Sequence, residues 1–166
     1  MKKTLLILLT LVCIALTGTT IISAETTYTD QNALQGVDIG KGLFDINLTH
    51  AAKLELYLSV IKKTHADIIH QGKKPDFVIA FRGASVRLIS SETWSLSEED
   101  QKSLAKSAAI IKELQELGVV IEACSIATNL FKIDNSTLLP GIRVVGNTFI
   151  SLIGYQAKGY SLIPIQ

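Results

Sequence analysis

The run Leu117-Gly118-Val119-Val120-Ile121-Glu122-Ala123-Cys124-Ser125-Ile126-Ala127 contains the pattern that decides the fold. Gly118 is a typical C-terminal stop for a helix, and the β-branched residues that follow it predict a short buried strand. Cys124 stands at the far end of this strand, where a second helix can begin. A helix, a strand and another helix in close succession are typical of a protein built on a parallel sheet.

The segments before Leu117 show the same alternation of strands and helices. The run Asp76–Phe81 is almost wholly apolar, which is typical of a strand buried on both faces of a sheet. Ser97 with Asp100 three positions later resembles a capping box and indicates a helix start. In chain order we predict a strand over residues 43–48, a helix capped by Thr49 that runs to about His70, a strand over 76–81 with a short continuation over 86–89, a loop over 90–97, and a helix from about Glu98 to Leu117.

The segments after Cys124 complete a sheet of five strands. We predict a short helix over residues 125–131, turns at 134–136 and 139–141, a strand over 142–145, a helix from Asn147 or Thr148 to about Lys158, and a strand over 160–164. Pro164 has no N–H to donate, so the last strand is expected at an edge of the sheet. The alternation of strands and helices predicts one three-layer α/β/α domain with a mostly parallel five-stranded sheet.

The first 24 residues have the three parts of a secretory signal peptide. Lys2 and Lys3 supply a positive start, residues 5–16 are almost wholly apolar, and the segment up to Ala24 is small and polar. The apolar part is shorter than the about 20 residues that a membrane-spanning helix needs. We therefore expect export to the periplasm with cleavage near Ala24 and loss of Cys13. An uncleaved membrane anchor is the alternative, because Ile22 is bulky where the cleavage site prefers a small residue.

The composition of the remaining chain excludes some classes of partner. Removal of these 24 residues from the 166 leaves 142, which is the usual size of one domain. Without Lys2 and Lys3, 14 basic residues stand against 15 acidic ones, and neither sign forms a long run. Nothing therefore indicates nucleic acid or, after cleavage, a membrane as a partner. We divide the chain into the signal peptide (1–24), a polar, flexible lead-in (25–41) and the α/β domain (42–166).

Cys124 would be the only cysteine of the exported chain. A lone cysteine in such a protein indicates an intermolecular disulfide, a buried inert thiol or a functional thiol. In open parallel sheets ligands bind outside the carboxyl ends of the strands, which is where the pattern places Cys124. The start of a helix also favours the thiolate. The sequence thus predicts a reactive thiol, with buried packing as the alternative.

Residues from the loops after three strands are expected near Cys124 at this edge of the sheet. His50 is a candidate base or hydrogen-bond donor, with a solvated histidine at a helix start as the alternative. Candidates for binding an anionic sulfur species such as thiosulfate, with structural roles as the alternative, are Arg82, Gly83, Ser85, Arg87 and Ser125. His65 and His70 do not share a helix face, so we predict neither a metal site nor a cofactor. Trp94 is a candidate for an oligomer contact or a pocket lid.

The C-terminal half resembles the DsrE/DsrF family of small sulfur-handling proteins. The residues that carry this resemblance, in the family's order and spacing, are Glu116–Val119, Glu122–Cys124, Leu138–Val145 and Leu152–Pro164. The resemblance is looser over residues 44–89, where a strand, a long helix and the Phe81-Arg82-Gly83 end still follow in order. It implies a three-layer α/β/α fold with a five-stranded parallel sheet and assembly into homotrimers or hexamers.

The resemblance also implies a function for Cys124. In sulfur-relay members of the family, a cysteine at this position accepts sulfane sulfur as a persulfide and passes it on. We therefore predict an exported sulfur carrier or sulfurtransferase-like protein, whose partners are a small sulfur compound or an acceptor thiol protein. Two other functions fit the residues: a non-catalytic oligomeric binding module whose strand-end pocket takes a small anion or a peptide, and a redox sensor that forms an intermolecular disulfide through Cys124.

Overall fold

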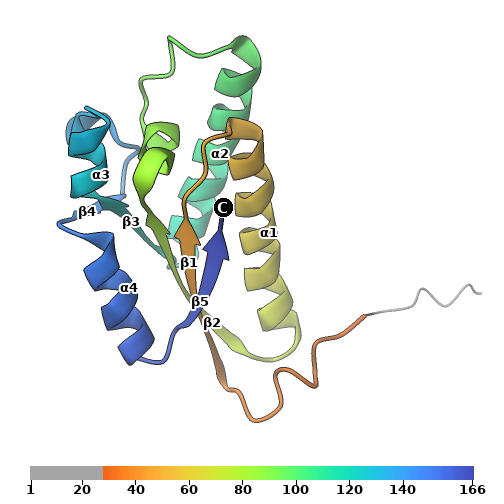
Figure 1. Cartoon of the computed structure of the whole chain (residues 1–166). Coiled ribbons are helices and arrows are strands. Elements are labelled where there is room, and N and C mark those ends of the chain that lie inside the picture. The colour runs from red at the N-terminus through yellow and green to blue at the C-terminus, as the bar shows by residue number, and fades with distance from the viewer. Residues whose placement is uncertain (1–27) are drawn as a thin grey trace, which may run out of the picture.

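The computed structural model describes residues 28–166 and shows an α/β fold (Figure 1). The predicted signal peptide lies outside the described residues. The elements in chain order are β1 (Ile39–Ile46), α1 (Ala51–His70), β2 (Lys74–Phe81), the 3₁₀ helix η1 (Gly83–Ile89), α2 (Glu98–Glu116), β3 (Val120–Cys124), α3 (Ser125–Leu130), the 3₁₀ helix η2 (Asn135–Thr137), β4 (Arg143–Val145), α4 (Thr148–Ala157) and β5 (Ser161–Ile165). None of these helices is both long enough and apolar enough to cross a membrane.

The five strands form one sheet in the order β4-β3-β2-β1-β5, and every pair of neighbours is parallel. β5, which contains Pro164, lies at an edge as predicted. Because the strands are parallel, their carboxyl ends meet at one edge of the sheet. The segments that follow β1, β2, β3 and β4 all begin at this edge. The predicted fold, a parallel five-stranded sheet between helical layers, is confirmed.

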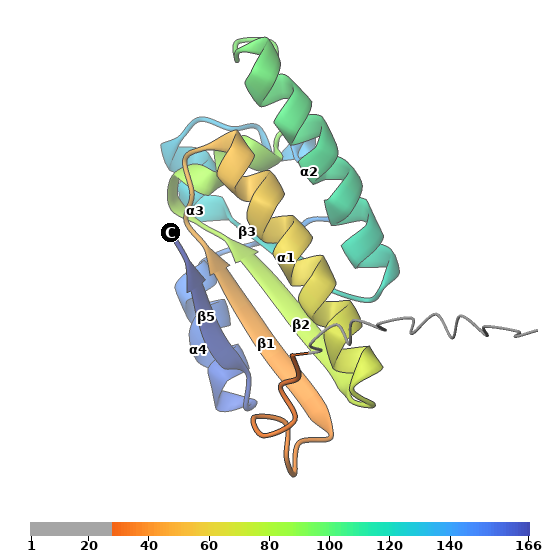
Figure 2. The ribbon, with the colours of Figure 1, turned by 90° about the vertical axis from the view of Figure 1, so that its right-hand side faces the viewer.

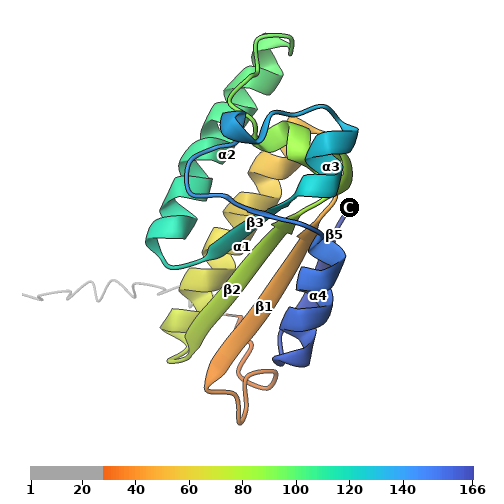
Figure 3. The ribbon, with the colours of Figure 1, turned by 90° about the vertical axis from the view of Figure 1, so that its left-hand side faces the viewer.

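The two faces of the sheet are covered unequally. α1 and α2 pack side by side over one face, where Phe44 and Ile79 meet Leu58 of α1 in the main core (Figures 1 and 2). Figure 3, drawn from the other side, shows the short α4 over the opposite face. There Leu152 of α4 packs in a second, smaller core on side chains from β1 and β2, namely Leu43, Val78 and Ala80.

Several helix ends follow the capping residues that the sequence indicates. Ser97 is the N-cap of α2, and its hydroxyl oxygen accepts a hydrogen bond from the Asp100 backbone N–H at 3.1 Å. Asn147 caps α4 in the same way, with its side-chain oxygen 2.9 Å from the Phe149 backbone nitrogen. Gly118, just past α2, has a φ of 86°, a conformation that other residues rarely adopt.

Three predicted boundaries were wrong. Residues 86–89 do not continue a strand, because they belong to η1, which Gly83 begins with a φ of 56°. The N-cap of α1 is His50 rather than Thr49, whose hydroxyl pairs with the His50 ring at 3.0 Å. β1 begins at Ile39, inside the segment that we expected as a lead-in, since residues 39–42 pair with residues 74–77 of β2.

Candidate functional site

Cys124 lies where two helices begin at the carboxyl edge of the sheet. It is the last residue of β3 and the N-cap of α3, and it is paired with Val145 of the neighbouring β4. α4 starts at Thr148, three positions after Val145. The Ser125 hydroxyl donates to the Gly146 carbonyl at 3.0 Å, which holds the connection into α4 against the start of α3. Ser125 therefore positions the surroundings of the thiol.

These surroundings lower the pKa of the Cys124 thiol. Burial by itself raises the pKa, but hydrogen bonding from the Thr148 hydroxyl and from the backbone N–H groups of Thr148, Ala127 and Ile126 outweighs it. The Cys124 side chain makes no capping hydrogen bond to α3 in the structure. The thiolate is the form that these donors stabilise, because a negatively charged sulfur is the stronger acceptor at a helix N-terminus.

Arg82 points into the same edge and is held there by Asp45. Its Nε lies 2.6 Å and its Nη2 2.9 Å from the two carboxylate oxygens, a bidentate ion pair in which the Asp45 side chain is only 6% exposed. The pKa of Arg82 is raised chiefly by this hydrogen bonding, and the nearby Cys124 thiolate raises it further. The guanidinium also lies 5.8 Å from the ring centre of Phe149, in the first turn of α4. The charge of Arg82 therefore interacts with that of the Cys124 thiolate, and a binding role of Arg82 stays a prediction.

The other predicted residues have different surroundings. Gly83 packs against Asn47, so a Cβ at this position would collide with the Asn47 side chain. Ser85 is fully buried, and its hydroxyl donates to the backbone carbonyls of Ile46 (2.9 Å) and Arg82 (2.7 Å). His50 is exposed and is not among the groups that lower the pKa of Cys124. The roles of these residues in binding or catalysis therefore stay predictions.

Access to the thiol is narrow, since Cys124 as a residue is 6% exposed. Burial to this degree also agrees with the alternative that the sequence left open, in which Cys124 is a packing residue. The lowered pKa and the adjacent guanidinium are not needed for packing, because a buried apolar pocket would raise the pKa of a thiol. The site therefore combines a shielded sulfur with groups that stabilise its charge. Within residues 28–166, no three metal-ligating side chains are grouped closely enough to hold an ion.

Two buried carboxylates at the sheet were not predicted from the sequence. Asp45 is described above, and Glu122 lies in β3 two positions before Cys124, where it is 3% exposed. The Tyr155 hydroxyl donates to Glu122 Oε1 at 2.9 Å, and Arg143 Nη1 is 3.8 Å from the same oxygen. The second oxygen, Oε2, has no hydrogen-bond partner. The sequence signal for Glu122 was its place inside a run of β-branched and apolar residues. A carboxylate is costly to bury in such a strand unless it is paired.

The chain is similar to several known proteins. The model of the DsrE/DsrF-like family matches residues 19–165. An uncharacterized protein from Aquifex aeolicus (strain VF5) is 30% identical over 125 residues, which cover 75% of this chain and 55% of that protein. The chain therefore spans about half the length of this curated relative.

A solved structure shares the fold. A protein of unknown function from Methanobacterium thermoautotrophicum superimposes with a TM-score of 0.59 and 20% sequence identity, over 74% of this chain and 96% of that one. At this identity the likeness concerns the fold alone. Since the family model covers most of the sequence and the fold agrees with it, the chain belongs to the DsrE/DsrF-like family.

Proposed function

We propose that the protein carries sulfur as a persulfide on Cys124. The observation that carries this proposal is the place of the buried sulfur at the end of β3 and the start of α3, where the Thr148 hydroxyl and the backbone N–H groups at the starts of α3 and α4 lower its pKa. They favour the thiolate, which is the nucleophile in sulfur transfer. A persulfide anion at the same place has the same sign of charge and can accept from the same donors. The family membership of the chain agrees with this role.

The transfer consists of two exchanges of one S–S bond for another. With thiosulfate as donor, the Cys124 thiolate attacks the sulfane sulfur, the new S–S bond forms on Cys124, and sulfite leaves with the electron pair of the bond that breaks. An acceptor thiolate then attacks the outer sulfur of the persulfide, and Cys124 leaves as a thiolate. Neither step requires an added oxidant or reductant. The same balance holds for a polysulfide donor, which leaves one sulfur shorter.

The burial of Cys124 favours small reaction partners. A thiol in a residue that is 6% exposed can be reached by thiosulfate or polysulfide more readily than by the cysteine of a second folded chain. This consideration disfavours the redox-sensor alternative, in which two copies would join through Cys124. An acceptor protein would have to present its thiol on a protruding segment.

We also propose that this chemistry takes place after export and in a homo-oligomer. The signal-like residues 1–24 support export. The outer side of α4 supports self-association, because three large apolar side chains there are well exposed: Phe149 (59%), Ile150 (68%) and Ile153 (68%). Size-exclusion chromatography with light scattering checks the assembly, and a monomer at high concentration would exclude it.

Sulfur uptake by the purified chain tests the proposed function. After incubation with polysulfide or thiosulfate, intact-mass spectrometry is expected to show whole-number additions of sulfur that a reductant removes. Because the Thr148 hydroxyl and the backbone N–H groups lower the pKa of Cys124, its thiolate should also react with iodoacetamide in the folded protein. Absence of both sulfur addition and alkylation would mean that Cys124 is a packing residue, and the proposal would fail.

Thr148→Val is expected to slow the reactions of Cys124 at lower pH. The wild-type pKa lies below the ordinary thiol value, and the lost hydroxyl is the strongest of the groups that lower it, so the pKa of the variant rises. Less thiolate is then present at a given pH, and alkylation well below the midpoint should slow several-fold. The measurement is the iodoacetamide rate as a function of pH.

Thr128→Val is the matched control for this variant. Thr128 is as buried as Thr148, but its hydroxyl donates to the Ser125 carbonyl at 3.1 Å and is not among the groups that lower the pKa of Cys124. Its pH profile should coincide with that of the wild type. If the Thr148→Val profile also coincided, Thr148 would have no part in stabilising the thiolate.

A further inference from the structure

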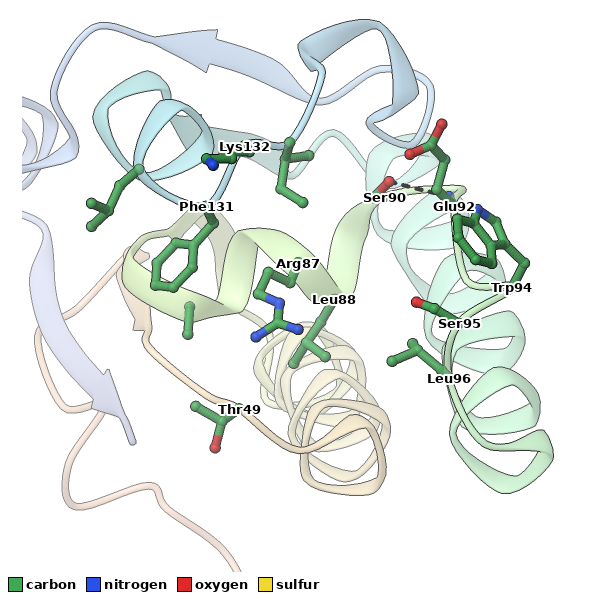
Figure 4. Close-up of a pocket in the computed structure, with 13 residues that line it drawn as sticks. Thr49, Arg87, Leu88, Ser90, Glu92, Trp94, Ser95, Leu96, Phe131 and Lys132 are labelled. Carbon is green, nitrogen blue, oxygen red and sulfur yellow. Dashed lines mark hydrogen bonds between the residues drawn. The ribbon is translucent and has the colours of Figure 1, made fainter.

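A second feature of the carboxyl edge lies apart from Cys124. A cavity of about 500 Å³ is bounded by Thr49 after β1, by η1, by the loop that contains Trp94, and by the residues that end α3 (Figure 4). Cys124 stands at the start of α3, whereas Phe131 and Lys132 line the cavity at its end. The volume is in the range of small-molecule sites, and the carboxyl edge is where open parallel sheets bind ligands.

Two cations of this cavity have no carboxylate partner. Arg87 and Lys132 are both exposed, and within residues 28–166 neither has an Asp or Glu oxygen within 4.0 Å. Figure 4 shows the Arg87 side chain across the middle of the cavity. Glu92, the acidic side chain of the lining, lies beside Trp94 and away from Arg87 (Figure 4). The centre of the cavity is therefore positively charged, with a planar fork suited to an anionic group.

The backbone at Lys132 fixes this residue at the rim of the cavity. Its φ is 56°, which makes Lys132 the one non-glycine residue with positive φ among residues 28–166. The Lys132 N–H donates to the Asn129 carbonyl at 3.2 Å, and the Ile133 N–H donates to the Thr128 carbonyl at 2.9 Å. These two hydrogen bonds end α3 in the usual left-handed way and hold the lysine beside the cavity.

Part of the cavity wall is apolar and aromatic, beside polar residues such as Thr49, Ser90 and Ser95. Trp94 is 82% exposed, although tryptophan normally buries most of its large ring. Phe131 faces the cavity from α3, and Leu88 and Leu96 line it from η1 and the loop (Figure 4). A ligand between these walls would cover the indole ring and gain apolar contact on both sides.

We infer that this cavity binds a small amphipathic anion, with its apolar body between Trp94 and Phe131 and its carboxylate or similar group on Arg87 and Lys132. The inference does not depend on sulfur chemistry, because the cavity does not include Cys124. In this proposal the exposed ring of Trp94 contacts the ligand. Uncharged molecules of the same shape should bind more weakly, since charge-assisted hydrogen bonds are stronger than neutral ones.

Fluorescence of Trp94 gives a direct measurement, because it is the only tryptophan of the chain. The probe is 3-phenylpropionate, titrated against 3-phenylpropan-1-ol, which has the same apolar body without the charge. We expect a saturable change in emission with the acid and binding of the alcohol that is weaker by about tenfold. A flat titration with the acid, or equal affinities for the two compounds, would overturn the inference.

Charge variants identify the anion contact. Arg87→Met should weaken binding of 3-phenylpropionate by about tenfold, and Lys132→Met should also weaken it. The matched control is Lys112→Met, since Lys112 is an exposed lysine on α2 outside this cavity, and its affinity should equal that of the wild type. Thermal unfolding verifies that each variant is folded. If Arg87→Met does not fold, the affinity of Lys132→Met for 3-phenylpropionate tests the anion contact instead. Unchanged binding in the folded lining variants would place the probe elsewhere.

Discussion

A chain with Cys124→Ser is expected to take up no sulfur from polysulfide or thiosulfate, whereas the wild type forms the persulfide. The serine hydroxyl is not ionised near neutral pH and cannot displace sulfite, so the loss should be complete rather than partial. Intact-mass spectrometry measures it. The fold should persist, because serine is a preferred N-cap residue at the start of a helix such as α3.

For the full chain with residues 1–24 retained, Cys13→Ser is the matched control, since Cys13 is the other cysteine of the sequence. This variant should take up as much sulfur as the wild type. Sulfur addition that persists in Cys124→Ser but vanishes in Cys13→Ser would assign the uptake to the predicted signal segment. The proposed function would then lose its chemical basis.

Arg82→Met is expected to lower the free energy of unfolding by about 3–5 kcal/mol, because it leaves the Asp45 carboxylate buried without its partner. Asp45 is 4% exposed and receives both of its short ion-pair contacts from Arg82. Urea denaturation measures the change. The double variant Asp45→Asn with Arg82→Met should recover part of the loss, since the uncompensated charge is then removed.

A surface ion pair provides the contrast for this variant. Lys106 lies 2.7 Å from Glu55, and its side chain is 55% exposed, so Lys106→Met should cost less than about 1 kcal/mol. If Arg82→Met were equally mild, water would have to reach the Asp45 carboxylate, and the ion pair would not behave as a buried one.

The architecture could be predicted because its signals are local. The apolar run that became β2 has no polar side chain between Phe77 and Phe81, and only a central strand accommodates such a run. Capping by Ser97 and Asn147 depends on hydrogen bonds within one helical turn. These interactions need no knowledge of the rest of the chain, so the sequence contains them in full.

The error at η1 has a physical reason. Val86, Leu88 and Ile89 are buried, and a short buried 3₁₀ helix has the same composition as a short buried strand. The deciding contact is the Ser85 hydroxyl on the Ile46 carbonyl, which joins residues 39 positions apart. Such a contact appears only once β1 and β2 lie side by side.

The candidate site was predictable in position but not in detail. The end of β3 and the start of α3 could be placed from residues 117–127, and with them Cys124. The burial of Cys124 and the effect of Thr148 on its pKa could not be predicted in this way. Thr148 begins α4, which follows β4, and β4 lies beside Cys124 only because β3 and β4 pair. The role of Asp45 could not be predicted from its own segment, since its partner Arg82 follows a different strand.

The pairing of β1 with β5 has a consequence for the order of folding. Gly42 pairs with Ser161 and Ile46 with Ile165, so one side of β1 has no neighbour until the last residues of the described chain are in place. A chain in which β5 is absent or not yet docked displays the free N–H and C=O groups of β1 along that side, which is a template for pairing with other chains. Truncation before Ser161 should therefore promote aggregation, since β1 would then remain an open edge.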